Sequence, residues 1–101
     1  MPRVEVILRT CMEAAETEFL RAKGGGALDP VIELVCFDPK RPHTVSLAVW
    51  ERQELARRMD ERSAGAAAAL REAPPDDCPF TIVVATLEGV RIFHRPEPRS
   101  V

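Results

Sequence analysis

The strand-forming segments of this chain lack the alternation of apolar and polar residues, and this feature most restricts the possible folds. Residues 31–37 read Val-Ile-Glu-Leu-Val-Cys-Phe, and residues 80–85 read Phe-Thr-Ile-Val-Val-Ala. An antiparallel sheet with one face in water shows a clean alternation instead. If the helices cover one face of the sheet, the other face stays apolar. Large exposed apolar patches mark interfaces, so we expect another protein surface to cover it, the alternative being the tail or a loop of the same chain.

Turn and helix signals place the other elements around these strands. Residues 44–50 and 90–94 follow the two apolar segments as return strands, which predicts two hairpins. The helical period of residues 11–23 ends at three glycines, which suit a helix C-cap. Residues 51–73 predict a second helix, bent or interrupted at residues 63–65 and stopped by two prolines.

Residues 3–9 fit two structures. Their β-branched residues favour a strand, whereas their apolar stripe also fits a helix. The segment Thr10-Cys11-Met12-Glu13 matches a capping box, which would begin a helix at Cys11 and leave residues 3–9 as a strand.

These elements predict an α+β two-layer sandwich in the order (β)αββαββ. Its sheet would be mainly antiparallel with four or five strands, and two helices would cover one face, with a ferredoxin-like plait as the first arrangement. Without the first strand, two αββ units remain the alternative. At 101 residues the chain has room for a single core, so we expect one domain over residues 1–95 and a short tail over residues 96–101.

The composition restricts the environment and the partners. Hydrophobic residues make up 46% of the chain, and the net charge is −2. Such a chain is globular and has no overall field that attracts nucleic acid or an anionic membrane. The three cysteines are odd in number and widely spaced, which indicates reduced thiols. With no signal peptide and no membrane span in the sequence, we expect a soluble cytoplasmic protein without a membrane partner.

No motif for catalysis or for a cofactor is present. Cys78 follows two aspartates, which oppose formation of a thiolate. His43 and His94 are isolated histidines without metal-ligand spacing. The three glycines follow a helix, whereas a phosphate loop precedes one. We therefore predict no catalytic residue, no metal and no cofactor, and a non-enzymatic role is favoured although an enzyme is not excluded.

The sequence leads to one function and two alternatives. The first is a non-enzymatic interaction or regulatory module that self-associates through the apolar sheet face. We expect it to form a homodimer or to bind a protein partner. The second is a small-ligand-binding protein or enzyme built as a dimeric α+β barrel. The third is a sheet platform for single-stranded RNA. The predicted interface residues are Val35, Phe37, Ala48, Trp50, Val83 and Phe93. The predicted anion or nucleic-acid contacts are Lys40, Arg41, His43, Arg91 and Arg95.

Overall fold

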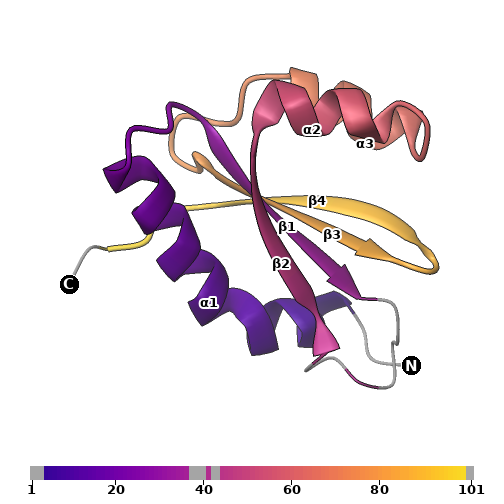
Figure 1. Cartoon of the computed structure of the whole chain (residues 1–101), viewed down its shortest axis with the longest axis horizontal. Helices are drawn as coiled ribbons and strands as arrows, with labels where there is room; N and C mark the ends of the chain where they lie inside the picture. The colour runs from indigo at the N-terminus through magenta and orange to yellow at the C-terminus, as the bar shows by residue number, and fades with distance from the viewer. Residues whose placement is uncertain (1–3, 37–40, 42–43, 100–101) are drawn as a thin grey trace.

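The chain forms one open, mixed sheet with helices on both of its faces (Figure 1). The computed structural model describes residues 4–36, 41 and 44–99. The elements are α1 (Val4–Gly24), β1 (Pro30–Cys36), β2 (Ser46–Glu51), α2 (Arg52–Met59), α3 (Ala64–Arg71), β3 (Phe80–Thr86) and β4 (Gly89–Arg95). The four strands lie in the order β2-β1-β3-β4.

The pairing of the strands confirms both predicted hairpins and adds a parallel pair. β1 pairs antiparallel with β2, and β3 pairs antiparallel with β4. The two central strands, β1 and β3, run parallel. The prediction of a mainly antiparallel sheet is therefore confirmed for both hairpins and wrong for the central pair of strands, β1 and β3.

The prediction of two helices on one face is wrong, because α1 covers one face and α2 with α3 covers the other (Figure 1). On the α1 side, Phe19 packs with Ile32 and Ile82 in one buried cluster. On the opposite side, Leu55 and Leu70 pack with the next residues along the same strands. The arrangement has three layers and departs from a ferredoxin-like plait, whose helices share one face.

This double cover explains the missing alternation. The side chains of β1 and β3 are buried on both faces of the sheet, apart from half-buried Val35 and Thr86 near the strand ends. Parallel strands at the centre of a sheet with helices on both faces read as continuous apolar runs. The strands lack alternation because helices cover both faces of the central strands.

Of the two structures that residues 3–9 fit, the described residues 4–9 adopt the helix, because α1 begins at Val4, and the argument for a strand from the capping box is wrong. Ile7 and Leu8 are buried against the sheet and extend the apolar stripe that Ala15 and Phe19 continue. Thr10 caps no helix: its hydroxyl donates to the carbonyl oxygen of Val6, 2.9 Å away, within the helix. Burial of this stripe outweighs the small propensity cost of β-branched residues.

The predicted ends of the helices are confirmed. The glycines terminate α1, and Gly26 has a φ of +97°, which glycine adopts without strain. The helix of residues 51–73 is interrupted where expected: Ser63 caps α3 by accepting a hydrogen bond from the amide of Ala66 at 3.2 Å. On the exposed face of α2, Glu54 pairs with Arg57, three residues further along the helix.

Candidate functional site

The two edges of the sheet differ in their protection. β4 carries Arg91, His94 and Arg95 and is followed by Pro96. Charged residues and proline are common means of preventing an edge strand from pairing with another chain. β2 reads Ser-Leu-Ala-Val-Trp-Glu, with no charge before its last residue and no proline. The β2 edge therefore lacks the protection that β4 has.

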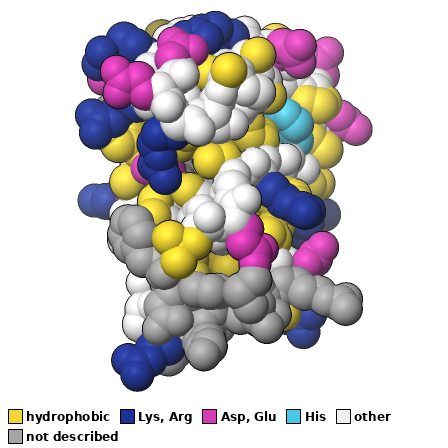
Figure 2. Space-filling model, turned by 90° about the vertical axis from the view of Figure 1, so that its right-hand side faces the viewer, with side chains coloured by type: hydrophobic (Ala, Val, Ile, Leu, Met, Phe, Trp, Pro, Cys, Tyr) yellow, Lys and Arg dark blue, Asp and Glu magenta, His cyan; other side chains and the backbone are white. Residues whose placement is uncertain are grey.

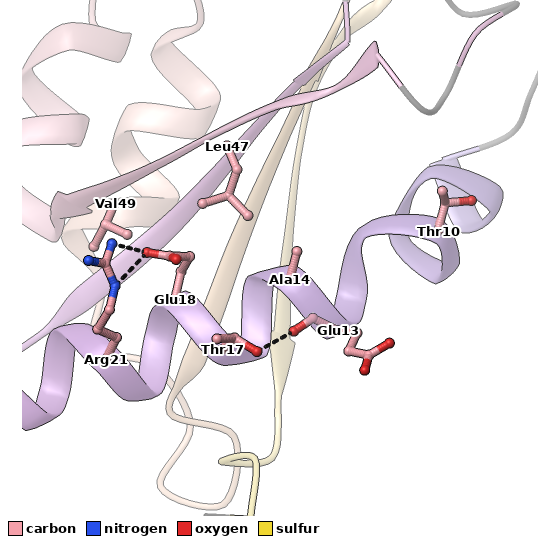
Figure 3. A pocket seen from close by; sticks show the side chains of 8 residues that line it. All are labelled: Thr10, Glu13, Ala14, Thr17, Glu18, Arg21, Leu47 and Val49. Atoms are coloured by element: carbon pink, nitrogen blue, oxygen red, sulfur yellow. Dashed lines mark hydrogen bonds and ion pairs between the residues drawn. The ribbon is translucent and has the colours of Figure 1, made fainter.

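An open groove lies between the β2 edge and α1 (Figure 3). Its volume is about 880 Å³. Leu47 and Val49 border it from the sheet, and Val49 is 37% exposed. From the helix side, Glu18 and Arg21 form an ion pair close to Val49 (Figure 3). The groove is lined by Thr10, Glu13, Ala14, Thr17, Glu18, Arg21, Leu47 and Val49.

A second pocket, of about 410 Å³, lies on the opposite side of β2. Glu33 and Trp50 form its sheet side, and residues of α2 form its other wall. The indole Nε1 of Trp50 donates a hydrogen bond to Oε1 of Glu33 at 2.9 Å. This pocket brings carboxylate and guanidinium side chains together next to Trp50, the only tryptophan of the chain.

The predicted interface residues do not form one open face. Val83 is fully buried beneath α2 and α3, which removes it from any surface contact in the folded chain. Val35, Ala48 and Trp50 are half-buried on the same side. Phe93 packs in the α1 cluster, on the opposite face from Trp50, so these two rings cannot form one stacking platform. Phe37 lies outside the described residues.

The predicted basic contacts are also separated. Arg41 belongs to the β1–β2 connection, whereas Arg91 and Arg95 lie on β4, at the far edge of the sheet from β2. Lys40 and His43 lie outside the described residues. On the face seen in Figure 2, Lys and Arg side chains are interspersed with Asp and Glu, so that face has no continuous basic surface.

One buried arginine was not predicted from the sequence. Arg52, the first residue of α2, is 3% exposed. Its Nε and Nη2 donate to the two carboxylate oxygens of Asp29 at 2.7 and 3.1 Å. Its Nη2 also donates to Oγ1 of Thr81 at 2.7 Å, and Oγ1 lies 3.1 Å from Nδ1 of His94. Arg52 lies in a charged stretch that reads as a solvent-exposed helix face, so no sequence signal identifies it.

The environments of the three cysteines do not favour a reactive thiolate. Cys11, Cys36 and Cys78 form no disulfide. Burial, and then the nearby Cys36, raise the pKa of the Cys11 thiol, which disfavours the reactive thiolate. Among residues 4–36, 41 and 44–99, no cluster of three or more histidine, cysteine or carboxylate side chains is placed to hold a metal ion. No helix in the same residues has the length and apolar character that crossing a bilayer requires.

Comparisons with known proteins give no relative for this arrangement. No protein-family model matches the chain, and neither the curated proteins nor the solved structures searched include a significant match.

Proposed function

We propose that this chain is a non-enzymatic interaction module that forms a homodimer by pairing the β2 strands of two copies edge to edge. The unprotected β2 edge beside an open groove is the observation that carries this proposal. β2 pairs with β1 on one side, and no other described strand pairs with its outer side. Addition of a strand there satisfies backbone groups and covers apolar side chains together.

The β2 sequence suits antiparallel pairing with itself. In a register centred on Leu47, Val45 lies opposite Val49 of the second copy, and Ser46 lies opposite Ala48. Leu47 and Val49 face the α1 side, where the groove lies. A two-fold axis at Leu47 would therefore join the two grooves at the seam of an eight-stranded sheet.

The charges of α1 fit the same two-fold axis. Thr17 lines the groove from α1 and Leu47 lines it from β2 (Figure 3), and we place the same two-fold axis at the level of Thr17 on the helix. Glu13 and Arg21 lie four residues to either side of Thr17. Antiparallel α1 helices centred on Thr17 would bring Glu13 of each copy opposite Arg21 of the other. This complementarity of charge favours a second copy over an unrelated strand.

The association state of the purified chain tests the proposal. Sedimentation velocity at micromolar concentration should show a dimer. Thr17→Arg puts two like charges at the axis and should weaken the dimer about tenfold or more. Ala68→Arg is the matched control, because Ala68 is an exposed helical residue of α3, away from the groove. It should leave the dimer unchanged.

A charge exchange tests the register. E13R places arginines opposite one another in each of the two α1 contacts and should weaken the dimer. E13R/R21E restores opposite charges and should recover part of the affinity. A wild-type chain that sediments as a monomer, or a dimer that tolerates Thr17→Arg, contradicts the proposal.

A further inference from the structure

The pocket on the other side of β2, which we call the Glu33 pocket, contains a buried carboxylate that forms no ion pair with the described residues. It is lined by Glu33, Val35, Trp50, Leu55, Arg57, Arg58, Met59, Glu61 and Arg62. Glu33 is 7% exposed, and its cross-strand neighbours Ala48 and Val83 are apolar. Within the described part of the chain, no cationic group lies within 4.0 Å of its carboxylate. A glutamate this buried is normally paired with a cation.

The Glu33 carboxylate is held in place but incompletely satisfied. Trp50 Nε1 donates to Oε1 at 2.9 Å, and no other hydrogen bond reaches the carboxylate from the described residues. The Arg58 guanidinium, which also lines the pocket, lies on the Trp50 ring instead, 4.6 Å from its centroid. The second oxygen, Oε2, is therefore available to a donor that enters the pocket. An ammonium group supplies both the charge and the hydrogen bonds.

The rest of the wall excludes a simple cation. Three arginines line the Glu33 pocket against one further carboxylate, that of Glu61. Arg57 is paired with Glu54, whereas Arg62 forms no side-chain ion pair with any described residue. A ligand with positive charge alone would meet these guanidinium groups at close range. A ligand that also carries an anionic group would be attracted to them.

We infer that the Glu33 pocket binds a free α-amino acid. The α-ammonium group donates to Glu33, and the α-carboxylate accepts from the guanidinium N–H groups of Arg62 and Arg58. The volume of about 410 Å³ holds a molecule of this size. Val35 and Met59 supply an apolar wall for the ligand's side chain. The site is independent of the proposed dimer, because it lies on the opposite side of the sheet from the α1 groove.

Fluorescence of the chain's single tryptophan reports on this pocket directly. The chain is titrated with the common amino acids other than tryptophan, whose own emission would mask that of Trp50, and with a matched set of 2-aminobutyrate, propylamine and butyrate. Amino acids, 2-aminobutyrate among them, should give a saturable change in Trp50 emission at about 1 mM or below. Propylamine and butyrate, which each lack one charge, should bind at least about tenfold more weakly.

Two variants locate the ligand. E33Q keeps an acceptor for Trp50 and removes the negative charge, and R62Q removes an exposed guanidinium without affecting the core. Each should weaken binding about tenfold or more, while Glu72→Gln, on the exposed end of α3, leaves it unchanged. T17R should retain binding even where the dimer is lost. Absence of saturable binding by every amino acid, equal affinity for propylamine, or unchanged affinity in both E33Q and R62Q overturns the inference.

Discussion

Arg52 links four parts of the chain through one guanidinium group. Asp29 precedes β1, Arg52 begins α2, Thr81 lies in β3 and His94 lies in β4. The side chain is buried, whereas its partner Asp29 is 48% exposed. The Nη1 atom of Arg52 is buried without a hydrogen-bond partner among the described residues. The ion pair is therefore asymmetric, because only one partner depends on the other for solvation.

This asymmetry predicts unequal costs for the two truncations. Asp29→Ala leaves a buried cation without its carboxylate and should lower the free energy of unfolding by about 2 kcal/mol. Arg52→Met replaces the buried cation by an apolar chain and leaves Asp29 in contact with water, so it should cost about 1 kcal/mol or less. Urea unfolding of both variants measures the difference. A larger loss in Arg52→Met would mean that the guanidinium is a net stabilising group.

His94 makes the stability depend on pH. Burial, and then the charge of Arg52, lower the pKa of His94 below its ordinary value. Thr81 accepts from Arg52, which directs the hydroxyl hydrogen to Nδ1 and favours the neutral ring. Below about pH 6.5 the unfolded state thus binds more protons than the folded state. This contribution is absent at higher pH and increasingly destabilising as the pH falls.

His94→Gln should therefore lose less stability than the wild type between about pH 7.5 and about pH 5.5. The matched control is His43→Gln, which removes the other histidine of the chain. Urea unfolding at each pH gives the comparison. Equal pH dependence in the wild type and His94→Gln would show that His94 titrates alike in the folded and unfolded states.

At the scale of elements, local signals predicted the helix ends better than the first helix start. Glycines and Ser63 act through backbone geometry, which a short sequence window contains. Residues 4–10 depend instead on burial of Ile7 and Leu8 against strands distant in the sequence. A capping-box pattern at Thr10 satisfied the local rule and was outweighed by that packing.

Two glycine substitutions at the end of α1 should change the stability in opposite directions. Gly26→Ala places a Cβ on a residue with a φ of +97° and should cost about 1 kcal/mol. Gly24→Ala lies within the helix, where no heavy atom approaches the new Cβ within 4 Å, and should stabilise by about 0.5 kcal/mol. Thermal unfolding of the two variants tests the signs. A stabilising Gly26→Ala would contradict the positive φ of Gly26 at the end of α1.

At the scale of the molecule, the predicted position of α2 and α3 on the same face as α1 was wrong. Unalternating strands fit either a sheet with one uncovered apolar face or a sheet covered on both faces. The choice depends on the parallel pairing of β1 with β3, which places the α2–α3 connection across the face that α1 leaves free. The candidate site follows from the same topology: charge and proline content distinguish β2 from β4, but only the strand order makes both of them edges.

Hydrogen exchange across the sheet tests this topology and the proposed dimer together. The amides of β1 and β3 are enclosed by neighbours on both sides and should exchange slowest at every protein concentration. Outward-facing amides of β2 gain partners in the dimer, so their protection should rise with concentration. Those of β4 remain at an open edge and should not respond.

T17R should abolish the response in β2 and leave β1 and β3 protected, because the substitution weakens association and not the fold. If β4 rather than β2 gained protection, two copies would associate through the opposite edge, and the role assigned to the groove beside α1 would be wrong.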